Sequence, residues 1–547
     1  MAAEFTPVNK TSAWSSLLAH RQAHPVDLKQ AFAADPRRAK TLSVATEHVF
    51  YDYSRQLVTG ETMRRLFDLA KERDLKGKIQ AMFRGDKINV TERRAVGHMA
   101  LSAPRGEPFV VDGKDYNPEI HAVRQKFEKF SYEVLSGKRL GFTGKKITNI
   151  LAIGIGGSEL GPEFLAEACE PFAAPGMRLK FVANVDGTDF AKKTADLDPE
   201  ETLVVVESKT FTTAETMKNA ETAKRWIQQK MGGSPEVIKK HFVAVSTAKD
   251  KVEAFGIDPE NMFIFWDFVG GRYSSRSAVG GVPLSLLLEY DNFAAILAGT
   301  RWMDEHFSNA PFERNIPVIC GLIDILNINF NGYRTRGLLP YSQGLKRLPA
   351  HTQQVEMESN GKSADILGRP LDFDTGEVVF GEPGTDSQHS YLQLFHQGKQ
   401  IIPADFIGFI RPQHPLGVAT RDEVTHHEEL MANFFAQQDA LAFGKDDANL
   451  AKNFPGNRPS SSLLLEVLNP FTAGILLALT EHRAAVKGFI WGINSFDQFG
   501  VELGKKLGVD MRKRMLSFHR TGQIDTAGLN PATAIQLKAL LTGRLPE

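Results

Sequence analysis

The sequence has few cysteines and no net charge, and each absence excludes a class of protein. Only two cysteines, Cys169 and Cys320, occur among 547 residues, so neither a disulfide scaffold nor a C-x-x-C redox site is predicted, and a reducing compartment fits. Basic and acidic residues both number 65, which gives no bulk attraction for nucleic acid or an anionic membrane. Any anion that binds must therefore be held by a local site.

Signals for membrane insertion and export are also missing. The apolar run Ala473–Leu479 is much shorter than the ~20 residues that cross a bilayer, and charged residues soon follow it, so it predicts a buried helix. The first residues, MAAEFTPVNKTSAW, lack the apolar core of a signal peptide, which predicts a cytoplasmic location. His426-His427-Glu428-Glu429 lacks the spacing of the H-E-x-x-H zinc motif, so we expect chemistry without a metal.

Helical and strand patterns divide the chain. Up to about residue 115 the pattern is helical, as in Thr62–Arg73, and Thr91–Val96 also predicts a helix. Beyond it, short β-branched runs alternate with helical patterns, which predicts two α/β units with parallel sheets covered on both faces. The predicted strands are Ile147–Ile155, Leu179–Val185, Thr202–Glu207, His241–Ser246, Asn261–Trp266, Gly376–Gly381 and Asp405–Ile410. The predicted helices here are Ala214–Gln229, Ser390–His396, Val424–Phe443 and Leu463–Leu479, the last with Pro470 as a kink or break.

A glycine-rich turn follows the first predicted strand. Gly154–Gly161 reads GIGGSELG, and glycines between a strand and a helix let backbone N–H groups approach an anion. Glu159 takes the place of the third small residue of a dinucleotide fingerprint, and the Gly-Lys-Ser/Thr of a Walker A loop is absent. The turn thus indicates a phosphate without a nucleotide. The alternative is a structural turn in which Ser158 caps the helix.

A second turn on the same predicted sheet is rich in hydroxyl groups. Ser208–Glu215 reads SKTFTTAE, with four hydroxyl side chains and one lysine. Hydroxyls donate hydrogen bonds to phosphate oxygens. Thr212 and Glu215 fit a capping box, but a cap requires one hydroxyl rather than four. We therefore interpret the two turns as parts of one anion site.

Two stretches offer a fixed cation and a carboxylate base. Paired glycines precede Arg272 in Val269–Ser274, so a positive charge is presented beside a tight backbone, although a structural ion pair is the alternative. Gln353–Lys362 carries Glu356 and Glu358, which would share a side if the stretch were a strand. One well-placed carboxylate can abstract a proton next to a carbonyl, whereas the alternative is a solvated acidic loop.

Two further stretches offer proton carriers. His389 opens a predicted helix that continues to the competing His396, and a histidine at a helix N-terminus tends toward the neutral form. A capping or half-buried histidine is the alternative. Gln498, Glu502 and Lys505 have helix-compatible spacing, and a solvated surface helix is the alternative there.

Together these stretches resemble blocks of the glucose-6-phosphate isomerase family, also called the phosphoglucose isomerase family, in its order. Asp267–Gly280 (DFVGGRYSSRSAVG) and Gly488–Lys505 (GFIWGINSFDQFGVELGK) resemble its two long signatures. The shorter blocks are Gly85–Arg94 (GDKINVTERR), Gly154–Ser158, Ser208–Thr213, Met357–Lys362 and Gln388-His389. The resemblance spans roughly residues 50 to 510.

The resemblance implies a fold, an activity and a partner. It implies two sugar-isomerase-type α/β domains with parallel-sheet cores flanked by helices, a helical N-terminal segment and a C-terminal arm. The expected boundaries are 1–115, 116–290 with the phosphate cradle, 291–512 and 513–547. It also implies reversible isomerisation of glucose 6-phosphate and fructose 6-phosphate through a cis-enediolate, a reaction of glycolysis and gluconeogenesis. The protein would be a homodimer with its site near the interface, without metal or cofactor.

The resemblance further implies roles for residues at matching positions. Glu358 matches the base that moves a proton between C1 and C2, Arg272 the group that stabilises the enediolate, and His389 and Lys505 the groups of ring opening. The positions expected to bind substrate are Gly157, Ser158, Ser208, Lys209, Thr210, Thr213, Gln354 and Gln498. The chain departs from many relatives at Ser275-Arg276, where an apolar residue and tryptophan are common, which alters the expected packing and polarity nearby.

Two other functions remain open at this point. A bifunctional isomerase would also accept mannose 6-phosphate. A sugar-phosphate-binding regulator would keep the fold without turnover, although a sensor has no need of a base such as Glu358. We expect a hexose 6-phosphate as the ligand and no nucleic acid or membrane partner, and no secretion signal supports an extracellular role.

Overall fold

The structure is a computed structural model that describes residues 6–546. The chain forms two compact units, one up to Phe496 and one from Asp497 onward. Among the helices of the described part, none combines the length and hydropathy that a bilayer-spanning segment needs.

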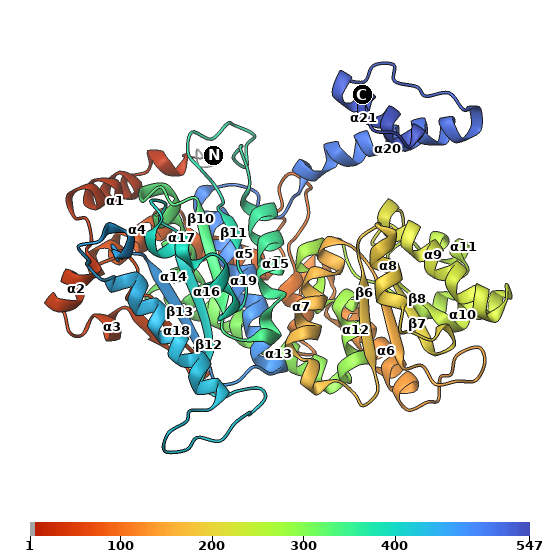
Figure 1. Cartoon of the computed structure of the whole chain (residues 1–547), viewed down its shortest axis with the longest axis horizontal. Helices are drawn as coiled ribbons and strands as arrows, with labels where there is room; N and C mark the ends of the chain where they lie inside the picture. Colours follow the sequence, from red (N-terminus) through yellow and green to blue (C-terminus); the bar gives the residue numbers. More distant parts are fainter. Residues whose placement is uncertain (1–5, 547) are drawn as a thin grey trace. The chain divides into compact units, whose positions relative to one another are not determined.

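The larger unit contains two main sheets (Figure 1), and the first is entirely parallel. Its strand order is β6-β5-β7-β8-β9. The strands are β5 (Asn149–Ile153), β6 (Arg178–Val182), β7 (Thr202–Glu207), β8 (Phe242–Val245) and β9 (Met262–Phe263). Each overlaps a run that the sequence predicts as a strand. Both β7 and β8 are buried along their whole length, as expected of central strands covered on both faces.

Helices cover both faces of this sheet, as the parallel order requires. Side chains alternate along β7, so Val204 and Val206 pack with residues of α9 (Ala214–Met231), whereas Leu203 and Val205 join the core that includes α6 (Asn117–Leu135). The other helices around this sheet are α7 (Leu160–Ala168), α8 (Gly187–Thr194), α10 (Pro235–His241), α11 (Lys249–Phe255) and α12 (Ala278–Leu288). The predicted fold class is therefore confirmed for this half.

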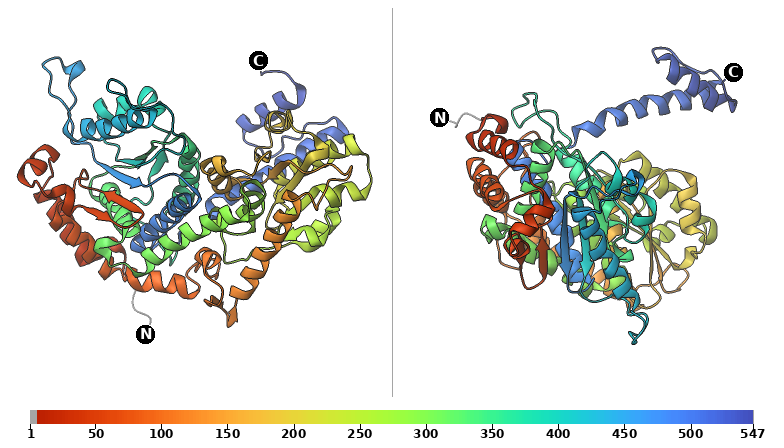
Figure 2. Two further views of the ribbon diagram at one scale, coloured as in Figure 1. Left: turned by 90° about the horizontal axis from the view of Figure 1, so that it is seen from below. Right: turned by 60° about the vertical axis from the view of Figure 1, so that its left-hand side comes forward.

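The second sheet is mixed and has the order β1-β2-β13-β12-β10-β11. Its parallel strands are β10 (Thr335–Pro340), β11 (Val378–Phe380), β12 (Ala404–Phe409) and β13 (Ser460–Leu465). The antiparallel strands β1 (Ser43–Ala45) and β2 (Val49–Asp52) come from the segment that the sequence predicts as helical. They are too short to carry a readable alternation, and pairing of β2 with β13 places them in the sheet, as the red and blue strands in Figure 2 show.

The sequence predictions for two helices and for the role of Pro470 are wrong. The predicted helix Leu463–Leu479 begins as strand β13, and helix α19 (Pro470–Trp491) starts only after it. Pro470 is at the first helical position, where its missing N–H has no cost, so it starts the helix rather than kinking it. Thr91–Val96 is not helical, because Asn89 pairs with Arg94 across a tight turn.

Long buried helices form the centre of the larger unit. Helix α19 packs along α13 (Tyr290–Asn309) and α14 (Ile316–Ile325). The apolar run Ala473–Leu479 lies within α19 and is buried, as predicted. Cys169 and Cys320 are buried free thiols, so they form no disulfide.

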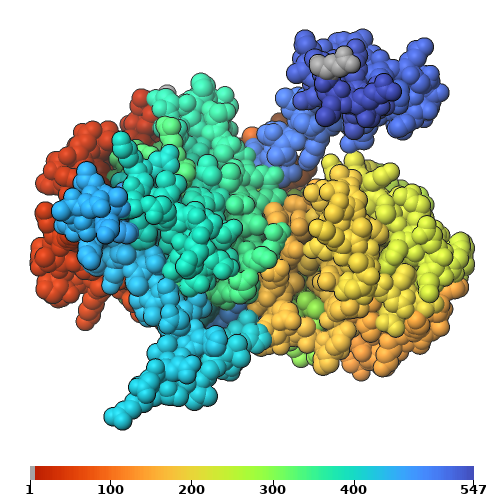
Figure 3. Space-filling model, viewed as in Figure 1, coloured from red at the N-terminus to blue at the C-terminus, as the bar shows by residue number. Residues whose placement is uncertain are grey.

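The remaining helices of this unit are shorter. They are α1 (Ser12–Ala23), α2 (Leu28–Ala34), α3 (Arg38–Thr41), α4 (Gly60–Glu72), α5 (Leu75–Arg84), α15 (Leu348–Gln353), α16 (Asp386–Ser390), α17 (Leu392–Gln397) and α18 (His426–Phe443). Strands β3 (Val110–Val111) and β4 (Lys114–Asp115) form a small hairpin. A loop between β12 and α18, residues 410–425, projects from the body in Figure 3.

The C-terminal unit consists mainly of α20 (Glu502–Thr521) and α21 (Pro531–Thr542). Arg514 forms ion pairs with Asp510 in its own helix and with Asp525 in the connection to α21. Helix α20 has no buried residue. Its apolar side chains therefore lack a core of their own.

Candidate active site

The two turns that the sequence predicts to bind an anion follow β5 and β7, which are neighbouring strands of the first sheet. Strand β5 is followed by a connection to β6 on one side, whereas β7 pairs with its other edge. The two connecting segments leave the sheet in opposite directions at this point, which is where open α/β sheets bind ligands. The glycine-rich turn after β5 and the hydroxyl-rich turn after β7 both lie at this edge, as the sequence predicts.

In the hydroxyl-rich turn the side-chain hydroxyls contact one another and do not cap a helix. Thr213 occupies the N-cap of α9, yet its side chain forms no capping hydrogen bond, so the predicted capping box of Thr212 is wrong. Instead Ser208 Oγ donates to Thr213 Oγ1 over 3.3 Å, and the hydroxyls of Thr210 and Thr212 are 2.7 Å apart. Phe211 adopts a left-handed φ of 52° and buries its ring below the turn. The turn is thereby folded around a cluster of hydroxyl donors.

Lys209 supplies the cation of this turn. Its Nζ lies 3.1 Å from Asp267 Oδ1 and 3.5 Å from the carbonyl oxygens of Trp266 and Val269. Burial lowers the pKa of Lys209, and the neighbouring Asp267 opposes that shift. The two carbonyl contacts of this ammonium are long and therefore weak. A phosphate oxygen can replace them, because a hydrogen bond between two charged groups is stronger.

The glycines of the first turn let its backbone touch two other parts of the site. A Cβ on Gly157 would lie 2.1 Å from the carbonyl oxygen of Gly271 and 2.5 Å from the amide nitrogen of Arg272, so no larger residue fits. A Cβ on Gly156 would lie 3.1 Å from Gln354 Nε2. Ser158 ends the short 3₁₀ turn Gly156–Ser158 and does not cap α7, so that alternative is wrong.

Arg272 and Glu358 form the ion pair at the centre of the site. Arg272 Nη1 lies 3.3 Å from Glu358 Oε2, and Gln354 Nε2 donates to the same oxygen over 3.2 Å. Arg272 also donates from Nε to Ser359 Oγ (2.8 Å) and from Nη2 to the carbonyl oxygen of Ser495 (2.6 Å). The arginine side chain is 1% exposed and the glutamate 17%, so a fixed cation faces a carboxylate that solvent or substrate can still reach.

The backbone around Glu358 differs from the strand considered in the sequence analysis. Gln354–Glu358 is a π-helical turn that continues α15. Glu356 is therefore buried at 1% exposure, whereas Glu358 faces the site. Wide π turns inside helices are frequent at functional sites because they redirect side chains.

His389 is not a member of this ion pair. It is exposed on α16, and the predicted continuous helix to His396 is interrupted at Tyr391, where α17 begins separately. Among the described residues, no hydrogen bond or ion pair joins His389 to Glu358 or Arg272. His396 instead bonds Gln437 and is half-buried, which favours a structural role for it.

Lys505 and Gln498 belong to the C-terminal unit. Lys505 is exposed on the first turn of α20, beside Glu502. Gln498 precedes a separate 3₁₀ turn, so it does not share a helix with Lys505 as the spacing predicts. The larger unit by itself thus contains the cradle and the Arg272–Glu358 pair.

The departure at Ser275-Arg276 creates a buried charge network that sequence reasoning missed. Arg276 is fully buried and forms ion pairs with Asp304 (2.6 Å) and with Glu481. His482 Nε2 lies 2.7 Å from Asp304 Oδ1. Burial raises the pKa of Glu481 to about 7, and Arg276 opposes the shift. The signal available in the sequence was the charged Arg276 at a position where an apolar residue is expected. Its partner Glu481 is about 200 residues away in the chain, so the sequence could not identify the ion pair.

One group of carboxylates within residues 6–546 is close enough to hold a metal ion. It comprises Asp324, Glu356 and Glu377. The ammonium of Lys487 lies 3.1, 2.8 and 2.7 Å from oxygens of these three residues in that order. The lysine therefore takes the place that a cation would occupy, and these residues do not fit a metal site.

Comparisons with known proteins identify the family to which the chain belongs. A family model described as phosphoglucose isomerase matches residues 52–530. The cytosolic glucose-6-phosphate isomerase B of Oryza sativa subsp. japonica is 49% identical, over 97% of this chain and 96% of the relative. The cytosolic isomerase 1A of Clarkia lewisii is 48% identical, over 98% and 95%.

A solved structure gives the same answer for the fold. The crystal structure of a glucose-6-phosphate isomerase from Chlamydia trachomatis superposes with a TM-score of 0.88 at 33% identity. The match covers 98% of this chain and 100% of that one. The match of sequence over 52–530 and of structure over nearly the whole length shows that this chain belongs to the phosphoglucose isomerase family.

Proposed function

We propose that this chain catalyses the reversible isomerisation of glucose 6-phosphate and fructose 6-phosphate. The observation that carries the proposal is the contact of the glycine-rich turn with both parts of the acid–base centre. Gly157 abuts the backbone of Arg272, and Gly156 abuts Gln354, which bonds Glu358. A phosphate held at this turn places the remaining carbons of a short sugar chain beside the Arg272–Glu358 pair.

The phosphate end of the substrate is bound by the two turns. Ser208, Thr210 and Thr213 donate from their hydroxyls, Lys209 supplies the charge, and the backbone at Gly157 and Ser158 adds N–H groups. Because these contacts are the same for substrate and transition state, they set affinity more than rate.

The reacting end of the substrate meets Glu358 and Arg272. His389 and Lys505 open the sugar ring, and Glu358 then takes the proton from C2 and returns it to C1, or the reverse. Negative charge develops on the enediolate oxygens, and the buried guanidinium of Arg272 stabilises it. Gln354 steadies the carboxylate through its hydrogen bond.

We also propose a cytoplasmic homodimer with its active site near the subunit interface. Apolar side chains without a core support an interface: Leu503, Leu507 and Leu516 on α20, and Leu416 and Val418 on the 410–425 loop, are all exposed. The relatives named above are cytosolic enzymes. Light scattering on the purified chain tests the assembly, with twice 60.6 kDa expected and the single-chain mass contradicting it.

The test of the activity is conversion of fructose 6-phosphate to glucose 6-phosphate by the purified protein in excess chelator. Rapid conversion is expected, because none of the proposed steps uses a metal. Absence of conversion, with sugar phosphate still bound, would favour a binding regulator. Mannose 6-phosphate in the same assay tests the bifunctional alternative.

The test of the base is Glu358→Gln. The amide keeps the size of the side chain and removes the proton acceptor, so we expect turnover to fall by a factor of about 10³ or more. Binding of sorbitol 6-phosphate, an open-chain analogue without a carbonyl, should persist. Near-normal turnover would exclude Glu358 as the base.

A further inference from the structure

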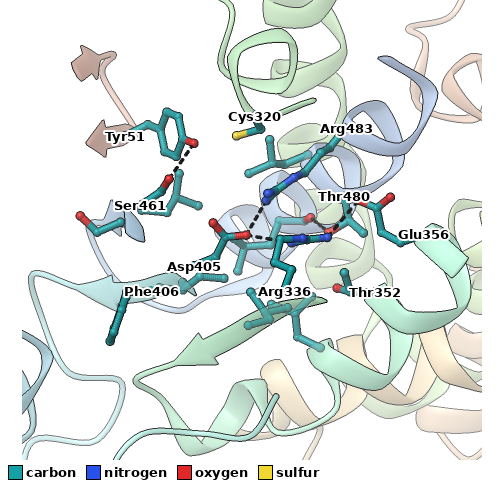
Figure 4. A pocket seen from close by; sticks show the side chains of 17 residues that line it. Tyr51, Cys320, Arg336, Thr352, Glu356, Asp405, Phe406, Ser461, Thr480 and Arg483 are labelled. Carbon is teal, nitrogen blue, oxygen red and sulfur yellow. Dashed lines mark hydrogen bonds and ion pairs between the residues drawn. The ribbon is translucent and has the colours of Figure 1, made fainter. Parts of the chain in front are cut away.

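A cluster of seven charged side chains lies buried beneath the active site. Its members are Asp324, Arg336, Glu356, Glu377, Asp405, Arg483 and Lys487. Figure 4 shows Arg336, Glu356, Asp405 and Arg483 around a pocket, whose volume is about 50 Å³. Burying charges in this way is costly unless every charge is paired and held in place, so the members of the cluster have fixed positions.

Glu356 connects this cluster to the π-helical turn that carries Glu358. Its Oε2 accepts from Lys487 Nζ (2.8 Å) and from Asn360 Nδ2 (3.3 Å), and its Oε1 accepts from Arg336 Nη2 (3.2 Å). The side chain of Lys487 is completely buried on α19. Glu356 and Glu358 are two residues apart on one turn, so fixing the first restrains the second.

Packing alone does not hold Glu356. It lines the cavity together with Thr352 and Arg336, so one side of it does not pack against other side chains (Figure 4). On that side, packing restrains the carboxylate less than in a filled core. The hydrogen bonds from Lys487, Arg336 and Asn360 must therefore set its position.

The same network reaches Arg272 from the opposite direction. Asn360 Oδ1 accepts from Ser495 Oγ over 2.7 Å, and the carbonyl oxygen of Ser495 accepts from Arg272 Nη2 over 2.6 Å. Asn360 also donates to the carbonyl oxygen of Ala484 on α19, over 3.1 Å. Asn360 thus links Glu356 to Ser495, and Ser495 in turn accepts a hydrogen bond from Arg272.

We propose that Lys487, Glu356 and Asn360 are positioning residues that set the relative placement of Glu358 and Arg272 for proton transfer. The inference rests on the proposed isomerase function and adds residues that do not touch the substrate. An error of about 1 Å in such a pair costs on the order of 10²-fold in rate. Affinity for the sugar phosphate should change little, because the cradle lies on the other sheet.

The experiment compares Asn360→Ala, Asn360→Asp and Lys487→Met with the wild type. Asn360→Asp keeps the shape and the acceptor for Ser495 but replaces the donor to Glu356 by a carboxylate. It therefore separates the hydrogen bond from the volume, and it remains informative if Lys487→Met does not fold. Ile475→Ala is the control for general loss of stability. Ile475 is buried on α19, the helix of Lys487, but lies outside the charge cluster and the cavity lining.

We expect kcat to fall about 10- to 100-fold in the Asn360 variants while KM for fructose 6-phosphate stays within about threefold. In D2O the fraction of product that carries solvent deuterium should rise, because a longer-lived enediolate gives the proton held by Glu358 more time to exchange with solvent. A purely structural defect reduces the number of active molecules and leaves that fraction unchanged, as expected for Ile475→Ala.

The inference is overturned if both Asn360 variants keep the wild-type kcat, or lose kcat with unchanged deuterium incorporation. An effect on KM alone also overturns it. The wild-type protein is measured in parallel, and only its failure to isomerise counts against the proposed function. The two conclusions can therefore fail separately.

Discussion

Glu481 gives the sharpest test of the buried network around Arg276. Its carboxylate is fully buried on α19, forms an ion pair with Arg276 and lies 3.8 Å from His98 Nε2. We consider Glu481→Gln, which keeps the shape of the side chain and removes its charge. Comparing the variant with the wild type measures how much the ionised carboxylate lowers the free energy of unfolding at neutral pH.

The magnitude follows from the pKa of Glu481. Burial raises it to about 7, from an ordinary value of 4.5. A raised pKa means that the folded state holds the proton more tightly than the unfolded chain. The stabilisation is fully present below about pH 4.5 and is lost as pH rises toward 7. At 1.36 kcal/mol for each pH unit, the wild type loses about 3 kcal/mol over this window, whereas the glutamine variant does not.

The assay is the urea-unfolding free energy of both proteins at pH 5, 6, 7 and 8, at one protein concentration. The stability of the variant relative to the wild type should rise by about 3 kcal/mol between pH 5 and pH 8. Burial lowers the pKa of both His98 and His482, so their contribution is lost as pH falls, which is opposite in direction to the effect expected for Glu481. Glu305→Gln, on a half-exposed side chain, is the matched control.

Parallel pH curves for Glu481→Gln and the wild type would refute this reasoning. They would mean that the carboxylate is as well stabilised in the folded protein as in water. An increase confined to the Glu305 control would refute it equally. A difference that grows toward acid, rather than toward base, would have the wrong sign for a raised pKa.

Four other predictions test the site. Arg272→Lys removes the planar fork that bonds Ser359 and Ser495, so kcat should fall about 10²- to 10³-fold, and a change in KM alone would contradict it. Lys209→Met should raise KM about tenfold or more with a smaller effect on kcat, measured by initial rates, and an unchanged KM would remove it from the cradle. Gly157→Ala should lower kcat and thermal stability together, because its Cβ would lie 2.1 Å from a carbonyl oxygen, and a fully active variant would contradict that contact. Dialysis against chelator should leave turnover unchanged, and restoration by an added divalent ion would require a different mechanism.

Much of the fold was readable from local patterns. The runs that became β5, β7 and β8 are mostly apolar and wholly buried, since central parallel strands are covered on both faces. Helix α4 matched its prediction because one face is apolar at helical spacing. Strands β1 and β2 were missed because β1 pairs with β2, and β2 joins the sheet only by pairing with β13, more than 400 residues away.

The sequence by itself determined the chemistry of the candidate site, because residue types and short spacings are local properties. The glycine-rich turn, the hydroxyl-rich turn and the candidate base Glu358 are all recognisable in the sequence. Only the tertiary structure decided which groups meet. Arg272 and Glu358 are distant in sequence. The π-helical turn that contains Glu356 and Glu358, and directs their side chains to different places, has no recognisable pattern in the sequence. Buried ion pairs such as Arg276–Asp304 depend on helix packing, because a charge is tolerated in a core only where a partner from elsewhere in the chain is brought to it.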